Sequence, residues 1–282
     1  MFDKLVSLGY LHRGFTKLFE RNEPRFTFRI NTKRPLEEIE KSLNKTYLKT
    51  IKRSYTYDLE VTNEYSTETF FSLMKDIANR NNFNGNPKTF YENFDKNFRE
   101  TDNVHYITIK VYPDKIISKA QEELTKVNKD LEDGKINEKH MADTKNIIAR
   151  LEKDIETFTP YKDNKEGLTI LTLICPKTDR AMWTLYIGNN SLAPYTFAVN
   201  RAYYEAIKYA QEHEFEFLDL FGTIGDPHTE VKNYAGIHEY KRKMGGTYTE
   251  FIGEFDIVNK KLWYKIMPTA MKVYRKLQKL FK

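Results

Sequence analysis

The chain has 282 residues, enough for one large hydrophobic core or two modest ones. Its 46 lysines and arginines outnumber its 40 acidic residues, and the formal charge of +6 is compatible with nucleic acid, an anionic membrane or a phosphorylated ligand without selecting one. The single cysteine, Cys175, excludes an intramolecular disulfide, and its apolar neighbours favour a buried core residue over a nucleophile.

No targeting or membrane-spanning segment is predicted. Charged residues interrupt the apolar ones in residues 1–10, unlike a signal peptide. No window approaches 18 uncharged apolar residues, so no transmembrane helix is expected. The cytoplasm is therefore the default compartment.

Alternating strand and helix patterns predict an α/β or α+β domain. Residues 1–22 show no complete helix or hairpin pattern. A single helix is expected from Pro35, with Thr32 as a candidate cap and its apolar face at Leu36, Ile39, Leu43, Tyr47 and Ile51. Ser66 is expected to cap the next helix. Further helices are predicted at 89–98 and 197–212, and strands at 26–30, 57–61, 104–112, 168–175, 182–187, 215–220 and 247–255.

Two heptad patterns lie in the middle of the chain. Apolar residues recur at spacings of 3, 4, 3 and 4 from Ile117 to Leu131, and again from Met141 to Ile155, with Gly134 between. This spacing predicts an antiparallel coiled-coil hairpin, inserted into the domain as an arm at 114–158. The arm carries slightly more acids than bases, which argues against phosphate binding by bulk charge.

The tail from Asn259 has eight basic residues, no acid, and apolar residues near helical spacing, with Pro268 as a kink. This pattern is typical of a basic amphipathic helix. Two interpretations remain open: a terminal helix packed on the domain with a solvated basic face, or a helix that makes peripheral contact with anionic lipid.

The stretch 215–255 combines a strand, a glycine-bearing loop, a short basic segment and a second strand, which suggests a site at the end of a sheet. Here and in its flanks the chain resembles the Fem family of aminoacyl-tRNA-dependent peptidoglycan bridge-forming transferases. The resemblance rests on five short motifs in family order: LGYLHRGF at 8–15, DIANRNNF at 76–83, FGTIG at 221–225, GIHEYK at 236–241 and IGEF at 252–255.

The resemblance implies two acyltransferase-like (GNAT-type) domains, most of the first being absent. Residues 1–22 would be the end of the first domain; residues 23–113 and 159–258 would form the second around the arm, followed by the basic helix at 259–282. A partner chain supplying the first half is one consequence. The implied reaction moves an amino acid from aminoacyl-tRNA, as co-substrate, to a lipid-linked or nucleotide-linked muramoyl-peptide, at the inner face of the membrane.

By resemblance, Lys241 is the catalytic residue, as an ammonium that stabilises the oxyanion or holds a carboxylate. Substrate binding falls to Tyr240, the loop residues Gly222, Thr223 and Gly225, and Arg80. For each, a structural role is the alternative: core packing for Tyr240, a salt bridge for Arg80, a solvated side chain for Lys241. Asp226 and Glu239 are candidate proton acceptors, although a turn at Asp226-Pro227 and a surface charge at Glu239 are the better explanations.

No histidine spacing supports a metal site, and no GxxxxGK[ST] loop supports ATP-driven ligation, so no cofactor is expected. Two other functions remain open. In the first, the chain is a non-catalytic half or binding module of a split or truncated protein. In the second, it is an acyltransferase that acts on a different amine.

Overall fold

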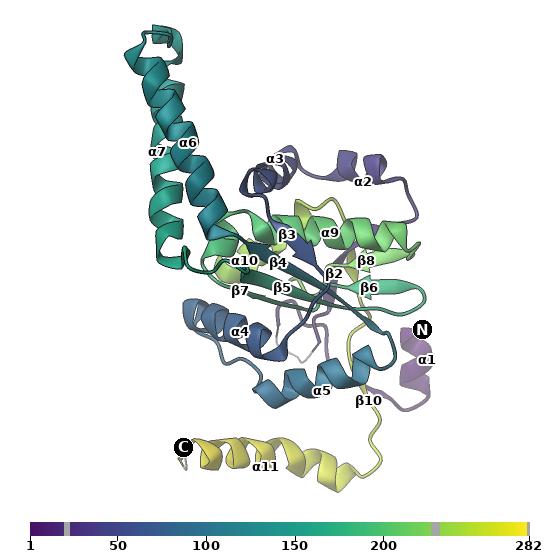
Figure 1. Cartoon of the computed structure of the whole chain (residues 1–282). Coiled ribbons are helices and arrows are strands. Elements are labelled where there is room, and N and C mark those ends of the chain that lie inside the picture. The colour runs from purple at the N-terminus through teal and green to yellow at the C-terminus, as the bar shows by residue number, and fades with distance from the viewer. Residues whose placement is uncertain (20–22, 227–231, 281–282) are drawn as a thin grey trace. The chain divides into compact units, whose positions relative to one another are not determined.

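The computed structural model describes residues 1–19, 23–226 and 232–280, which form a mixed α/β fold, as expected. The chain separates into two compact units. The larger unit comprises residues 28–221 and 240–247, and the smaller unit comprises residues 1–27, 222–239 and 248–282. Figure 1 draws the whole chain.

The larger unit is built on an antiparallel sheet with the strand order β3-β4-β5-β7. Its strands are β3 (Glu60–Thr62), β4 (Val104–Val111), β5 (Leu168–Pro176) and β7 (Tyr186–Asn189). Successive side chains of a strand point to opposite faces. Ile107 and Leu173 therefore pack in one buried cluster, while Tyr106 and Ile174 pack in another. Because helices cover both faces, β4 and β5 are buried along most of their length.

Helices α3 (Lys45–Ser54) and α9 (Ala198–Glu212) cover one face, and α4 (Thr67–Asn81) and α5 (Lys88–Arg99) cover the other (Figure 1). The predicted cap of α4 is confirmed, because the Ser66 hydroxyl accepts a hydrogen bond from the Thr69 backbone N–H at 3.3 Å. Short helices α2 (Leu36–Ser42) and α8 (Leu192–Tyr195) precede α3 and α9.

A second sheet has the order β6-β8-β2-β9, with β6 (Ala181–Trp183), β8 (Phe217–Asp219), β2 (Phe26–Asn31) and β9 (Thr247–Glu250). Within the larger unit, β8 pairs parallel to β6, where Met182 lies opposite Leu218. It also pairs antiparallel to β2, where Ile30 lies opposite Leu218. Strand β8 is therefore central, and it ends at the buried residue Asp219.

Both helices predicted for the arm are present, as α6 (Pro113–Glu132) and α7 (Met141–Phe158). They run side by side and project away from the first sheet (Figure 1). Pro113 stands at the first position of α6, where its missing N–H costs nothing. Ala120 and Leu151 are buried near the base of the hairpin.

The smaller unit contains α1 (Phe2–Ser7), a short antiparallel pair of β1 (Leu11–His12) and β10 (Phe255–Asp256), and α11 (Lys261–Leu280). Rings of Phe2, His12 and Phe255 contact one another with centroids 4.8–5.5 Å apart. Helix α10 (Lys232–Arg242) begins in this unit, and its last three residues belong to the larger unit. Within the described residues, no helix is both long enough and apolar enough to cross a membrane.

Three predicted elements differ from the structure near the start of the chain. Residues 1–22 contain helix α1 and strand β1, although no complete pattern was visible there. The helix expected from Pro35 is two helices, because Leu43 is extended and Asn44 caps α3 by accepting from the Thr46 N–H at 2.8 Å. Thr32 is not a cap; its buried hydroxyl donates to the Phe215 carbonyl at 2.6 Å.

Two predicted strands are divided. The strand expected at 182–187 is split into β6 and β7, which belong to different sheets. The reason is visible at Thr184 and Leu185, whose adjacent N–H groups donate to the Asp219 and Ile174 carbonyls respectively. The strand expected at 247–255 is split into β9 and β10, with Gly253 at φ +91° between them. Residues 227–231 of the predicted polar loop lie outside the described residues.

Candidate functional site

Lys241 is buried in the last turn of α10, with 9% of its surface exposed. Its Nζ donates a hydrogen bond to the backbone carbonyl of Phe221 at 2.8 Å. Burial lowers the pKa of the ammonium from 10.5 to about 8, and the nearby Asp219 carboxylate opposes part of this decrease. The solvated-lysine alternative is therefore wrong, and the side chain is a desolvated cation whose proton is held less tightly than usual.

Asp219 organises the backbone that Lys241 contacts. Its carboxylate is buried, and Oδ2 forms an ion pair with Arg29 Nε at 2.8 Å. Oδ1 accepts from the Phe221 N–H at 2.8 Å. Phe221 adopts the left-handed conformation with φ +59°, which is uncommon for a residue other than glycine. Strand β8, this turn and the end of α10 are thus joined by hydrogen bonds through Phe221.

Asp219 and Phe221 were not among the residues predicted for substrate or catalysis. The available signal was an acidic residue at the end of an apolar strand, next to a glycine loop. A carboxylate at such a position is also common in ordinary turns. The sequence alone therefore did not predict that Asp219 is buried or that it forms an ion pair.

Tyr240 contributes to the core of the larger unit. The residue is partly buried, and its ring meets Tyr47 and Tyr203 edge-on, with centroids 6.0 Å and 5.8 Å away. Its hydroxyl is buried beside these rings, and burial raises the pKa of Tyr240 well above 10. The same desolvation raises the pKa of Tyr203 to about 12. The geometry therefore gives Tyr240 a packing role.

The glycines of the predicted loop allow close packing in the smaller unit. A Cβ on Gly222 would lie 2.7 Å from the Pro24 ring, and one on Gly225 would lie 2.3 Å from the Phe26 ring. The Gly225 N–H donates to the Lys17 carbonyl at 2.6 Å. Packing is thus sufficient to explain why both positions are glycine.

Thr223 is buried between the same elements. Its N–H donates to the Phe26 carbonyl at 2.8 Å, and its hydroxyl lies 3.1 Å from His238 Nδ1. His238 stands on α10, three positions before Lys241 in the sequence. The threonine therefore links the loop to α10 within the smaller unit.

Arg80 belongs to the larger unit, near the end of α4. Its Nη2 donates to the backbone carbonyl of Asn189 at 2.5 Å and to the Asn189 side-chain oxygen at 2.7 Å. The structural alternative predicted for Arg80 was a salt bridge. Its partner is instead the neutral Asn189 at the end of β7. This contact fixes Arg80 beside the loop that follows β7.

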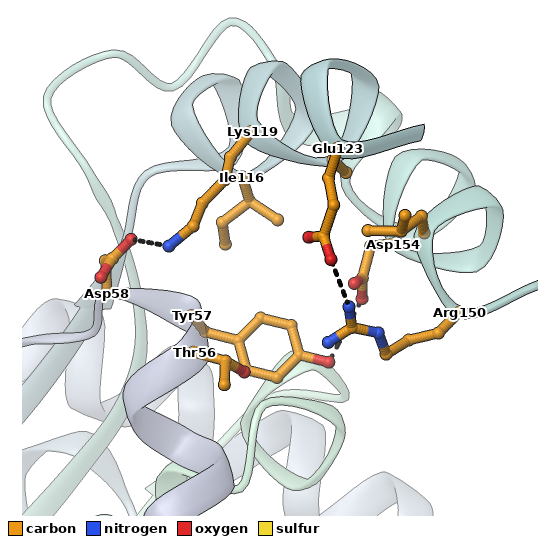
Figure 2. A pocket seen from close by; sticks show the side chains of 10 residues that line it. Thr56, Tyr57, Asp58, Ile116, Lys119, Glu123, Arg150 and Asp154 are labelled. Carbon is orange, nitrogen blue, oxygen red and sulfur yellow. Dashed lines mark hydrogen bonds and ion pairs between the residues drawn. The ribbon is translucent and has the colours of Figure 1, made fainter. Parts of the chain in front are cut away.

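A cavity of about 260 Å³ lies at the base of the arm, within the larger unit (Figure 2). Lys119 pairs with Asp58 at 2.9 Å, and Arg150 with Glu123 at 3.4 Å. The buried Asp154 accepts hydrogen bonds from Tyr57 at 3.2 Å and from Tyr195 at 2.7 Å. The Lys119–Asp58 pair and the hydrogen bonds of Asp154 hold the arm to the body of the unit, and the Arg150–Glu123 pair joins α7 to α6.

Cys175 is buried, as predicted, and burial raises the pKa of its thiol far above the ordinary value. Among the described residues, no group of three or more histidine, cysteine, aspartate or glutamate side chains is placed to hold a metal ion.

Comparisons with known proteins show which sequences and structures this chain resembles. The sequence profile of the FemAB family matches residues 1–272. Proteins of Staphylococcus aureus named lipid II:glycine glycyltransferase, including that of strain USA300, are 24% identical over 303 aligned positions, which cover 98% of this chain and 71% of the relative. A solved structure titled as that of FemX superposes with a TM-score of 0.70 and 22% identity, over 94% of this chain and 70% of that one.

Proposed function

The chain belongs to the FemAB family of aminoacyltransferases, and we propose that it moves an amino acid from aminoacyl-tRNA to an amine of a muramoyl-peptide precursor, extending a peptidoglycan bridge. Relatives covering nearly the whole chain are named for glycine transfer to lipid II. The buried ammonium of Lys241, at the position the family resemblance marks as catalytic, is the observation that carries the proposal.

The finer description of the fold belongs to the same proposal. Residues 23–113 and 159–258 form one GNAT-like domain, 114–158 a coiled-coil arm, and 1–22 the end of another such domain. The superposition on FemX supports this assignment at the level of fold. The order of elements supports it too, because the arm connects two central strands, β4 and β5, of a single sheet.

The reaction joins two substrates without oxidation or reduction. The acceptor amine attacks the ester carbonyl of aminoacyl-tRNA and forms a tetrahedral oxyanion. The bond from carbon to the ribose oxygen then breaks, an amide forms, and the proton lost by the amine is transferred to the departing oxygen or to water. Because the ester is already activated, the enzyme has only to align the amine, accept its proton and stabilise the negative charge.

Lys241 has the properties that this chemistry needs. At neutral pH a lysine with a pKa of about 8 is still mainly an ammonium, so it donates hydrogen bonds and places positive charge near a developing oxyanion. Its surroundings exclude most water, which strengthens the interaction. The Phe221 carbonyl holds the ammonium in one direction before substrate arrives.

The other residues have supporting roles in this proposal. Tyr240, the residue before Lys241, contacts substrate and fixes the end of α10 through its core contacts. Gly222, Thr223 and Gly225 shape the loop that leads from Phe221. Arg80, oriented by Asn189, contacts a phosphate of the precursor. No cofactor takes part, and the enzyme works at the inner face of the membrane.

The test is a transfer assay with charged tRNA and a lipid-linked or nucleotide-linked muramoyl-peptide. Lys241→Met is expected to lower the rate by about 10²–10³-fold, the usual effect of removing a preorganised oxyanion donor. Lys243→Met, a change of the same kind two residues away, should retain the wild-type rate. Circular dichroism and thermal unfolding would establish that both variants are folded.

Wild-type turnover by Lys241→Met would refute the catalytic role. Transfer from acyl-CoA with none from charged tRNA would refute the donor, and would favour the alternative acyltransferase. The predicted partner chain is tested in the same assay, by measuring the rate with and without a supplied first half of a FemAB relative.

A further inference from the structure

Helix α11 exposes an apolar band along its length. Eight large side chains of the helix are exposed: Leu262, Trp263, Ile266, Met267, Met271, Val273, Tyr274 and Leu277. At about 100° per residue they fall within one half of the helix circumference. Trp263 and Leu262 are exposed by 59% and 69% respectively. Exposed apolar side chains are ordinary when scattered, but a continuous band of them marks a surface that is covered in use.

Basic residues accompany this band. Residues 259–282 contain eight lysines and arginines and no acidic residue. In the helical register, Lys261 and Lys265 fall on the half opposite the apolar band. A helix with an apolar half and a basic half has the composition of helices that lie in the plane of a bilayer interface.

The first turn of α11 is attached to the rest of the smaller unit. Tyr264 donates from its hydroxyl to the Asp256 carboxylate at 2.6 Å, and Arg13 Nη1 donates to the same hydroxyl at 2.6 Å. Arg13 and Asp256 also form an ion pair at 3.2 Å. The start of α11 is therefore fixed to strand β10.

We propose that α11 docks the protein on a bilayer containing anionic lipid, with its apolar half among the acyl chains and its lysines among the phosphates. The charge selects this partner, because a segment with eight bases and no acid is complementary to a negatively charged surface. The helix lies on the bilayer without crossing it, since no described helix meets the requirements for a span. This docking does not depend on the transfer reaction, and the proposal is the same for any acceptor amine.

Tryptophan fluorescence provides a local measurement. The chain has two tryptophans, Trp183 and Trp263, so Trp183→Phe leaves a single probe on α11. Vesicles of phosphatidylcholine with an equal share of phosphatidylglycerol should shift the Trp263 emission to the blue and sediment the protein. Vesicles of phosphatidylcholine alone should bind far less. Raising the salt from about 0.05 M to about 0.5 M should weaken binding, because screening shortens the reach of the charges.

Charge variants test the face that binds. The triple variant Lys261→Gln, Lys265→Gln and Lys272→Gln should weaken vesicle affinity roughly 100-fold, since each basic residue near an anionic surface contributes a factor of about five. The matched control replaces the exposed arm residues Lys126, Lys129 and Lys145 by Gln, which changes the net charge equally. It should bind like the wild type.

Apolar variants test insertion. Leu262→Ser with Leu277→Ser should also reduce binding at low salt, because electrostatic attraction alone does not hold a helix at the interface. Three results would overturn the proposal: failure of anionic vesicles to sediment the protein, equal loss of binding in the arm control, or a Trp263 shift that follows protein concentration without lipid. The last would show that the band is buried between copies of the chain.

Discussion

Replacing Lys241 by methionine should change how the stability of the protein depends on pH. In the folded chain the pKa of Lys241 is about 8, and the ordinary value is 10.5. The folded state therefore binds this proton less tightly than the unfolded state does. A difference of roughly 2.5 in pKa corresponds to about 3 kcal/mol, which is the cost of keeping the charged side chain buried at neutral pH.

The sign follows from proton binding. Below about pH 8 both states are protonated at Lys241 and the full cost is present. Between about pH 8 and 10.5 the unfolded state keeps the proton while the folded state loses it, so this group raises the free energy of unfolding as pH rises. Lys241→Met lacks the titrating group. The stability of the variant relative to wild type should therefore fall by about 3 kcal/mol across this interval.

Denaturant unfolding of both proteins at about pH 7, 8.5 and 10 provides the measurement, because all other titrating groups are shared and cancel in the difference. Lys243→Met serves as the control and should give a constant difference. A difference for Lys241→Met that is equally constant from pH 7 to pH 10 would show that Lys241 titrates as an ordinary surface lysine. Both the buried-ammonium argument and the catalytic assignment would then lose their physical basis.

Two further substitutions test the surroundings of Lys241. Asp219→Asn removes the carboxylate that raises the lysine's pKa, so NMR titration of lysine Cε signals should place Lys241 below about 8, whereas an unchanged or higher value would contradict the electrostatic account. Gly245→Ala should destabilise the fold by roughly 2–4 kcal/mol in thermal unfolding, because φ is +71° and the new Cβ would lie 2.3 Å from the Ser42 carbonyl oxygen. Gly236→Ala, at a helical position with open space around it, should be neutral or stabilising, and an equal loss there would refute the steric argument.

The helices of the arm and the two long strands of the first sheet, β4 and β5, could be predicted because their patterns are local. The heptad spacing from Ile117 to Leu131 fixes one face of α6, and the short, β-branched apolar run from Leu168 to Cys175 favours a strand covered on both faces. The capping hydroxyl of Ser66 is likewise a property of the few residues that follow it. In such segments local preference and tertiary burial agree.

Prediction failed where neighbouring residues have different distant partners. The apolar spacing continues from Leu36 to Ile51, so periodicity alone gives one helix, but Asn44 ends it because its N–H donates to the Lys243 carbonyl and its side chain caps the next helix. Thr184 and Leu185 bond to two different sheets. Such breaks depend on residues far away in the chain and leave no periodic signal in the sequence.

The burial of Lys241 belongs to the same class of tertiary facts, and it explains why the candidate site needs Asp219. A lysine in the last turn of a helix is normally a solvated residue that interacts with the helix dipole. Here the side chain is desolvated, and the fold compensates with the Phe221 carbonyl and the field of the Asp219 carboxylate. Asp219 in turn fixes the Phe221 N–H, so one carboxylate both sets the direction of the acceptor carbonyl and helps the ammonium keep its proton. A change that moved Phe221 out of its left-handed conformation would therefore displace the ammonium as well, although the two residues are twenty positions apart.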